Sequence, residues 1–594
     1  MFRLPSLRHS FQFYSLTAVV LLSIVFLSKM FVVFYKDGEF FDGYSSPFFC
    51  NVIGNGNGKS SESAKGSPTG IKGGSELEAA AIGETVELTS TMTVTMTLTH
   101  TMTPTPTPVT LEKVIEEPEP QYCGYCTSTD EICKRYGSFN LARSRAYDGP
   151  NARLKRVLRK LRSGQKIKIG IIGGSVSAGH GLPDHRLNWS YLYAQYIRET
   201  FGSENVEVEL INGSVGATVS DYMETCFLEH ITEDVDLVII ELAINDMRLE
   251  KLAMGYENLI RAVFALPNRP AIVNLQIMAL MFPAITMGGD LHTAVAQYYD
   301  TPIVSVRNVL LPHILRSTEL NPTDTSVEDY WYYHNDDGSI DLRHLGITGH
   351  RMLADLLISF TSRVACEAWR EEQQQHAPAG SFVGGFDWSP YPDDRLDPDS
   401  PTPGTLSLPN PNEGIDVSEY IPRESLFQKF DHTTKLLPAR PFCQISAPNA
   451  KHPLMPLPQP VSSEGHDASD MSQVPDPSDA FALWSHPGNP GKVWLTGRKP
   501  GVKVSFAVKT SSLGRVRVTY LKSESYGLGS VWCWIDGDRE KGERLDGWWP
   551  VENIPQTVAE SLSPGDHILT CEILEDTKDP GGGTEFRIVA IDAL

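Results

Sequence analysis

The chain of 594 residues carries 73 acidic against 51 basic residues, a formal net charge of −22. Because nucleic-acid binding needs clustered lysines and arginines, this balance argues against a nucleic-acid partner and favours neutral or cationic ligands. The length exceeds what one hydrophobic core usually organises, so we expect two folded domains. The 48 glycines and 41 prolines indicate that much of the remaining chain is linker.

The first predicted element is a membrane anchor over residues 11–35. The segment is mostly apolar, with a single interior charge at Lys29, and is long enough to cross a bilayer. Arg3 and Arg8 precede it and acidic residues follow it, so the positive-inside rule places residues 1–10 in the cytosol. We expect a single-pass type II membrane protein of the Golgi, of another part of the secretory pathway, or of the cell surface. Its catalytic domain is then lumenal or extracellular. A cleaved signal peptide is the alternative, but no small-x-small cleavage site follows the apolar run.

Residues 36–120 are predicted to form a stalk. They pass from Gly/Ser-rich sequence through alternating threonines to a Thr-Pro repeat, a composition typical of O-glycosylated spacers. The nine cysteines predict disulfides in such a compartment, with Cys50 left unpaired. Cys123, Cys126 and Cys133 resemble part of a zinc site, but no further ligand pair at zinc spacing completes it, so disulfides are favoured there.

Residues 121–370 are predicted to form an α/β domain. Short apolar runs alternate with amphipathic stretches, which indicates a parallel sheet in a three-layer α/β/α sandwich. The expected strands are Lys166–Ile172, Val206–Ile211, Val235–Leu242, Ala271–Met278 and Pro302–Val306. The expected helices are Trp189–Phe201, Tyr256–Ala265 and Thr348–Trp369.

Residues 371–490 are predicted to be a linker, packed in part at most, because Pro, Asp, Ser and Gly dominate. From 491 to 594 the apolar period changes to two, which predicts an antiparallel β-sandwich. Cys533 and Cys571 fall in two of its strands and are spaced to cross-link them. Its aromatic residues either stack on sugar rings or pack in the core, and they are Trp532, Trp534, Trp548 and Trp549.

Ser175 is the candidate nucleophile. The sequence Ile-Gly-Ile-Ile-Gly-Gly-Ser leads from a buried strand into a glycine-lined turn, which exposes a hydroxyl and offers backbone N–H groups to an oxyanion. A phosphate-binding loop is the rival interpretation, but neither G-x-G-x-x-G nor a Gly-Lys-Ser/Thr sequence matches. Ser177 is the rival nucleophile.

A serine hydroxyl needs a base and an orienting acid, and Asp341-Leu-Arg-His344 supplies both. We expect these residues on one loop after the last strand, where side chains three apart can point inward together. An isolated Asp-x-x-His sequence more often lies on the surface without a catalytic role. Here the glycines that open the following helix favour a catalytic role.

Two further segments offer oxyanion donors. Asn245 ends a buried strand, where its amide can donate to a developing oxyanion, although an Asn-Asp turn without chemistry is the alternative. Gly216 follows the second strand with backbone N–H groups free.

Together these four segments resemble the blocks of the SGNH (GDSL-like) hydrolase superfamily over about residues 165–365. Ser175, Gly216, Asn245 and His344 would be its four name-giving residues. The resemblance implies a serine esterase with an Asp341–His344–Ser175 triad and an oxyanion hole made by the Ser175 and Gly216 N–H groups and the Asn245 amide. It implies no metal and no other cofactor.

The chain departs from the family pattern at two positions. Gly174 stands where the family usually has Asp, and Ala243 where Gly is common. Ala217 competes with Gly216 for the role of backbone donor. Neither departure falls on a residue that carries catalytic chemistry in the family.

The expected substrate is an acylated glycan from which the enzyme removes acetyl or another short acyl group. An O-acyltransferase working through the same acyl-serine and a non-catalytic glycan-binding surface protein are the alternatives. Lipid esters are a rival substrate, with Ile277–Met287 as a possible acyl-binding stretch. Two lumenal N-glycosylation sequons begin at Asn188 and Asn212; we expect the first to be accessible and the second to lie beside the oxyanion loop.

Overall fold

A computed structural model describes residues 118–202, 206–281, 285–376, 420–430, 441–447, 449–458, 479–485, 487, 492–548 and 552–594. The predicted anchor, Cys50 and nearly all of the predicted stalk lie outside these residues, as does Trp549. Within the described ranges, no helix combines the length and the apolar character needed to span a bilayer.

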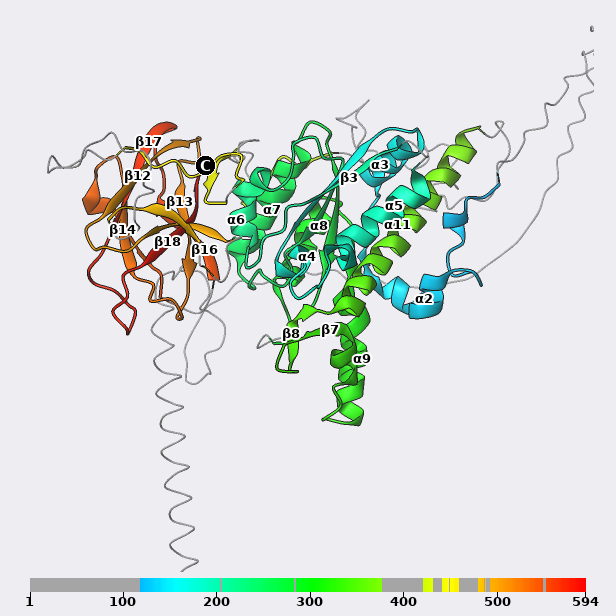
Figure 1. Ribbon diagram of the computed structural model, residues 1–594. Coiled ribbons are helices and arrows are strands. Elements are labelled where there is room, and N and C mark those ends of the chain that lie inside the picture. The colour runs from blue at the N-terminus through cyan, green and yellow to red at the C-terminus, as the bar shows by residue number, and fades with distance from the viewer. Residues whose placement is uncertain are drawn as a thin grey trace, which may run out of the picture. The chain divides into compact units, whose positions relative to one another are not determined.

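A six-stranded sheet forms the centre of the first domain (Figure 1). Its strand order is β1-β6-β5-β4-β2-β3, with all neighbours parallel except the antiparallel pair β1 and β6. The five predicted strands are confirmed. The strands are β1 (Arg145–Tyr147), β2 (Ile167–Gly173), β3 (Val208–Asn212), β4 (Leu237–Glu241), β5 (Ala271–Gln276) and β6 (Ile303–Ser305).

Helices cover both faces of this sheet, so the predicted three-layer α/β/α architecture is confirmed. One apolar cluster joins the sheet to α3, α5, α9 and α11, and the other joins it to α6, α7 and α8. Ile239 belongs to the first cluster and its neighbours Val238 and Ile240 to the second, as alternation along a central strand requires.

The helices of this domain are α2 (Glu131–Ser144), α3 (Ala152–Arg162), α4 (Ser175–Ala178), α5 (Trp189–Phe201), α6 (Ser220–Cys226), α7 (Glu250–Phe264), α8 (Gly288–Tyr298), α9 (Val306–Leu320), α10 (Ser326–Trp331) and α11 (Ile347–His376). Short 3₁₀ turns occur in this domain at Gln121–Cys123, His185–Leu187 and Phe227–Glu229, and in the second domain at Arg539–Lys541. A two-stranded hairpin of β7 (Tyr332–His334) and β8 (Ile340–Leu345) precedes α11.

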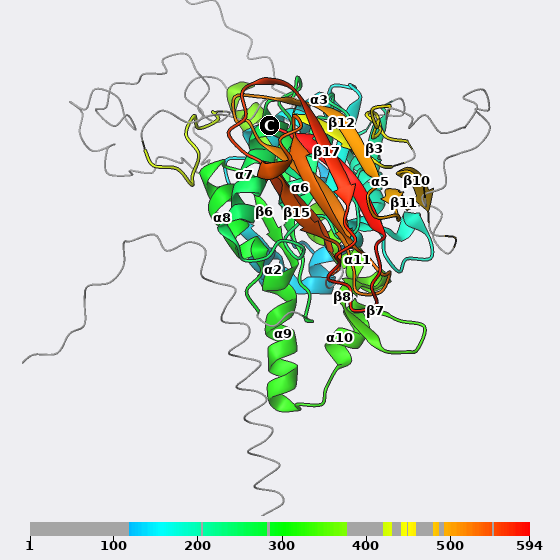
Figure 2. The same cartoon turned by 90° about the vertical axis from the view of Figure 1, so that its left-hand side faces the viewer.

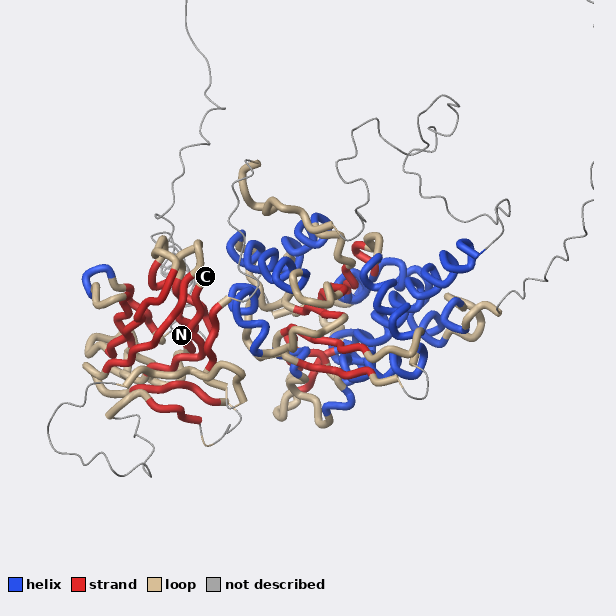
Figure 3. The backbone as a smooth tube through the Cα atoms, turned by 90° about the horizontal axis from the view of Figure 1, so that it is seen from above, coloured by secondary structure: helices blue, strands red, loops and turns tan. Residues whose placement is uncertain are grey.

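The second domain is an antiparallel β-sandwich, as predicted (Figure 3). One sheet has the order β10-β11-β18-β13-β16, with β9 also paired to β18; the other has the order β12-β17-β14-β15 and is seen at the front of Figure 2. Apolar side chains between the sheets form one core. The strands are β9 (Phe442–Ile445), β10 (Ala482–Ser485), β11 (Val493–Gly497), β12 (Lys503–Thr510), β13 (Val516–Lys522), β14 (Ser530–Ile535), β15 (Glu543–Asp546), β16 (Glu552–Ala559), β17 (Gly565–Ile573) and β18 (Phe586–Ala593).

Two of these strands, β9 and β10, come from the stretch predicted as linker. The linker interpretation therefore does not hold for them: each has only four residues, too few to show a period of two among the surrounding prolines. Their backbone groups are instead satisfied by pairing with β18 and β11.

Four disulfides join the described cysteines, and each of the eight has a partner. They are Cys123–Cys366, Cys126–Cys133, Cys226–Cys443 and Cys533–Cys571. The predicted link between β14 and β17 is confirmed, and disulfides rather than zinc account for the three cysteines near residue 130. Cys226–Cys443 connects α6 of the first domain to β9 of the second.

Candidate active site

Ser175 opens the short helix α4, directly after β2. Gly174 precedes it in extended backbone, and any Cβ there would collide with the side-chain amide of Asn245. The glycine that replaces the family's usual Asp thus allows Asn245 to pack against the nucleophile turn.

The structure brings the three predicted triad residues together. Ser175 Oγ lies 2.8 Å from His344 Nε2, and His344 Nδ1 lies 2.6 Å from Asp341 Oδ2. The His344 and Asp341 side chains are largely buried, while Ser175 is half-buried. The arrangement places one imidazole nitrogen on the hydroxyl and the other on the carboxylate, the geometry that general-base activation of serine requires.

Asp341 and His344 lie in strand β8 and not, as predicted, on a loop. The pairing with β7 runs from Tyr332↔Leu345 to Tyr333↔Asp341, so residues 342–344 lie opposite no residue of β7 and form a bulge in the hairpin. In a regular strand, residues three apart face opposite sides. The bulge breaks that alternation, and Asp341 Oδ1 accepts hydrogen bonds from the backbone N–H groups of Arg343 and His344.

The surroundings set the charge of the pair. Burial by itself would raise the pKa of the Asp341 carboxyl, but hydrogen bonds from the His344 ring and from Arg343 N–H bring that pKa below its ordinary value. Burial lowers the pKa of the His344 imidazole below its ordinary value of 6.5; the bond to Asp341 opposes this shift and His180 adds to it. A neutral His344 beside an ionised Asp341 is the state that can accept the serine proton.

Gly216 and Asn245 flank the nucleophile. A Cβ on Gly216 would lie 3.7 Å from the Ser175 Cβ, so this loop passes close to the reacting hydroxyl. Asn245 Nδ2 donates to Thr218 O at 2.7 Å. An amide carries two N–H donors, so one remains for an oxyanion while the other holds the loop. Ala217, the rival donor, has a left-handed backbone (φ 62°) and an exposed side chain.

Ser177 and Glu241 are buried beneath the nucleophile turn and hold it by hydrogen bonds. Ser177 is fully buried, and its hydroxyl donates to Glu241 Oε2 at 2.7 Å, so it is not available as the rival nucleophile. Burial raises the pKa of Glu241 to about 8, against weaker lowering by the hydrogen bond from Ser177. Sequence reasoning missed Glu241, although a glutamate inside an apolar strand is itself a signal, since unpaired buried carboxyls are rare.

The two sequon asparagines both hold the end of α4. Asn188 Nδ2 and Asn212 Nδ2 donate to the carbonyl oxygen of Ser177 at 2.9 and 2.8 Å. Asn188 is only 4% exposed and also caps α5, where its Oδ1 accepts from Ser190 N–H. The prediction of an accessible Asn188 is therefore wrong, because an N-cap side chain turns inward onto its own helix.

His180, which from sequence is expected to be structural or solvated rather than catalytic, also lies at the site. Its ring centroid lies 4.1 Å from that of His344 and 6.1 Å from that of Tyr333, and its side chain is exposed. It borders the triad on the solvent side.

Among the described residues, three groups come close enough to hold a metal ion. Two of them include cysteines that are joined in disulfides and offer no thiolate. The third is His180 with Asp341 and His344, whose ligand atoms lie within 4.8 Å of one another. Two of these residues already serve the hydrogen-bond chain to Ser175, so the group fits proton transfer better than a resident metal.

No family model matches the chain, and no curated protein matches it in sequence. Several solved structures are similar. One is a two-domain esterase active on acetylated mannans (18% identity, 76% of this chain and 97% of that chain, TM-score 0.49). A GDSL-like lipase from Parabacteroides merdae (14%, 33% and 96%, TM-score 0.26) and the esterase EstA from Pseudoalteromonas sp. (17%, 35% and 98%, TM-score 0.23) are others.

All three identities are below 25% and all three TM-scores below 0.5, so the assignment of chemistry depends on the geometry of the site. Ser175, Gly216, Asn245 and His344 come from four separate segments of the chain and meet at the carboxyl end of one parallel sheet. This is the arrangement that the resemblance to the SGNH hydrolase superfamily implies.

Proposed function

We propose that this chain is a serine esterase of the SGNH type that removes acetyl or other short acyl groups from glycans. The observation that carries the proposal is the continuous hydrogen-bond chain from Ser175 Oγ through His344 to Asp341, with distances of 2.8 and 2.6 Å. A structural cluster would not need a half-buried hydroxyl at the end of that chain, beside amide donors.

In the proposed reaction Ser175 Oγ attacks the ester carbonyl while His344 Nε2 takes the hydroxyl proton. The oxyanion is stabilised by the backbone N–H groups of Ser175 and Gly216 and by the free N–H of Asn245. The tetrahedral intermediate collapses as His344 gives its proton to the departing sugar oxygen. Water, deprotonated by the same histidine, then attacks acyl-Ser175 and releases the carboxylic acid. Asp341 holds the imidazole orientation and stabilises its charged form.

The proposed location is the lumen of the secretory pathway or the cell surface. Four disulfides among the described residues support an oxidising compartment, where structural disulfides persist. The anchor and the Thr/Pro-rich stalk predicted from sequence point the same way and would hold the enzyme among surface or lumenal glycans. Acetylated mannans are the substrate named for one of the similar structures.

The experiment compares the chain lacking its predicted anchor with Ser175→Ala in that same chain. Both are incubated with O-acetylated polysaccharide, short-chain aryl esters and long-chain lipid esters, and the released acids are quantified. We expect acetate release by the first protein alone. Release of long-chain acids without acetate would contradict the glycan proposal, and equal release by Ser175→Ala would contradict the nucleophile. Adding a sugar acceptor shows whether acyl transfer exceeds hydrolysis.

A further inference from the structure

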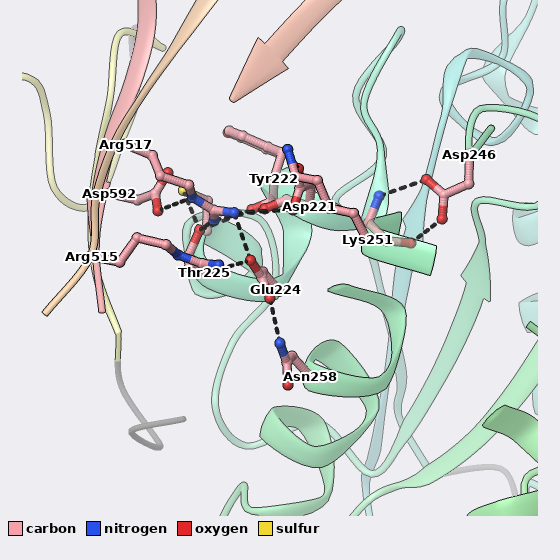
Figure 4. Close-up of polar contacts among 12 residues, drawn as sticks. Asp221, Tyr222, Glu224, Thr225, Asp246, Lys251, Asn258, Arg515, Arg517 and Asp592 are labelled. Atoms are coloured by element: carbon pink, nitrogen blue, oxygen red, sulfur yellow. Dashed lines mark hydrogen bonds and ion pairs between the residues drawn. The ribbon is translucent and has the colours of Figure 1, made fainter. Parts of the chain in front are cut away.

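Arg517 links the two domains through a buried network of hydrogen bonds and ion pairs. It lies on β13 of the β-sandwich, its side chain is 1% exposed, and it points toward α6 of the α/β domain (Figure 4). Burial of a guanidinium removes its hydration, and this loss is offset only if protein acceptors satisfy its donors. The position therefore requires a matched set of acceptors.

All five N–H donors of Arg517 have acceptors. Nε donates to Asp592 of its own sheet at 2.8 Å. Nη1 donates to the carboxylates of Asp221 at 3.1 Å and Glu224 at 2.6 Å, and Nη2 to the carbonyl oxygen of Asp221 at 2.7 Å and to Thr225 Oγ1 at 3.1 Å. Four of the five bonds thus end on α6. Only the planar fork of arginine matches such a set.

The helix that Arg517 holds is short and depends on its neighbours. All seven residues of α6 are buried, and an isolated helix of this length does not form in water. Its carboxyl end is tied to β9 by Cys226–Cys443, in the sheet that also contains β13. On its opposite side α6 packs closely against α7. A Cβ placed on Gly255 of α7 would lie only 3.1 Å from Asp221 N.

The oxyanion loop, residues 216–218, leads directly into the amino end of α6, which begins at Ser220. Ser220 donates from its backbone N–H to Asp246 Oδ1 at 2.8 Å, and its hydroxyl also donates to the Asp246 carboxylate. Asp246 follows Asn245, whose amide donates to Thr218 O. The loop, the asparagine and the first turn of α6 thus form one hydrogen-bonded unit. Figure 4 shows Arg517 and Asp246 on opposite sides of Asp221, which lies in that first turn.

We propose that Arg517 is a positioning residue for the oxyanion hole. By fixing α6, the β-sandwich sets the place of the 216–218 loop relative to Ser175, so the second domain is part of the catalytic apparatus and not only an accessory to it. This inference rests on the proposed esterase function and deepens it. It assigns no contact between Arg517 and substrate.

Arg517→Lys is the test variant, because lysine keeps the positive charge among three buried carboxylates but cannot reproduce the five-donor fork. Arg515→Lys is the matched control. Arg515 lies two residues earlier and binds the Glu224 carboxylate at 2.8 Å with a side chain 29% exposed. In the described structure it donates to no backbone carbonyl of α6, whereas Arg517 donates to that of Asp221. Both proteins are first shown to be folded by circular dichroism and thermal melting.

Kinetics per titrated active site give the first readout. For Arg517→Lys we expect kcat on an aryl acetate to fall about tenfold with KM within about twofold, since oxyanion stabilisation acts in the transition state. The acid limb of the pH profile should stay in place, because the triad is untouched. Arg515→Lys should keep kcat within about twofold of the wild type.

Amide hydrogen exchange of residues 214–219 gives a readout that needs no activity. We expect exchange there to accelerate about fivefold or more in Arg517→Lys and to be unchanged in Arg515→Lys. If Arg517→Lys does not fold, Thr225→Val, which removes one acceptor on α6, should show the same two effects at smaller size. Wild-type kcat and wild-type exchange in a folded variant, with only a lower melting temperature, would overturn the inference. An inactive wild type with the exchange effect intact would contradict the esterase function and leave the positioning role standing.

Discussion

His344 connects the other two residues of the triad, because its two ring nitrogens bond Ser175 and Asp341. Ser175→Ala and His344→Ala should each lower kcat at least about a thousandfold, and Asp341→Ala somewhat less, since an unoriented imidazole keeps part of its basicity. Ser177→Ala tests the rival nucleophile: its buried hydroxyl faces Glu241, so we expect a much smaller loss of kcat than in Ser175→Ala. Initial rates on an aryl acetate measure all four, and wild-type rates in the first three would exclude this triad.

The pH dependence follows from the environment of the same histidine. Burial holds the pKa of His344 below 6.5, so kcat/KM should fall only as the pH drops through that lower value and protonates the base. His180 lowers the pKa further by electrostatic repulsion. His180→Asn removes that repulsion, so the acid limb should move to higher pH. Its pH–rate profile measures the shift, and a limb that stays in place or moves to lower pH would show that the two rings do not interact.

At the scale of elements, the turn from β2 into α4 depends on the buried Glu241 at the end of β4. The folded-state pKa of about 8 lies above the ordinary value of 4.5. Between these values the unfolded chain gives up the proton while the folded chain keeps it, so the free energy of unfolding falls as the pH rises through this window. The slope is at most about 1.4 kcal/mol per pH unit.

Glu241→Gln does not titrate and its amide oxygen can still accept the Ser177 hydrogen bond. The wild type should therefore lose stability relative to this variant between about pH 5 and pH 8, by on the order of several kcal/mol over the window. Urea unfolding at a series of pH values measures the difference. Parallel stability curves for the two proteins would mean that Glu241 is ionised in the folded state.

The elements that the sequence predicts well are those in which regular apolar spacing continues over many residues and the ends carry capping signals. Trp189–Phe201 is observed with both predicted ends, because Asn188 caps its start and Gly202 follows its last residue. Strands β1, β7 and β8 escape prediction because three to six residues show little alternation, and β8 is further interrupted by its bulge. The prediction at Asn188 is wrong for another reason: a sequon does not show whether the asparagine side chain points toward solvent or caps a helix.

The sequence predicts the catalytic residues of the candidate site, but it does not predict the residues that hold them in place. Short sequence motifs predict all five residues of the candidate site: Ser175, Asp341, His344, Gly216 and Asn245. The supporting residues Glu241, His180 and Arg517 belong to no motif. Arg517 in particular lies some 300 residues from its partners on α6, as the separations of 296 and 293 residues show, and only the folded chain brings them together.

At the scale of the whole described molecule, the two domains are joined by covalent and ionic links at the same helix. Cys226–Cys443 closes a loop of 217 residues, whereas Cys126–Cys133 closes one of seven. Replacing the first pair by alanines should lower the free energy of unfolding by about 2–5 kcal/mol, and by more than replacing the second pair, because a longer loop restricts the unfolded chain more. Urea unfolding without reductant measures both, and a larger loss for Cys126–Cys133 would contradict this.

The most direct measurement of the central claim is to trap the acyl-enzyme. The wild-type chain is mixed with an acetyl ester, quenched in acid during turnover, and digested for mass spectrometry. We predict an acetyl group on the peptide that contains Ser175, at the hydroxyl of that serine, and none in His344→Ala, which lacks the base. This intermediate is common to hydrolysis and acyl transfer. Acetate release by the wild type without acetyl-Ser175, or with the acetyl group on another residue, would contradict the account.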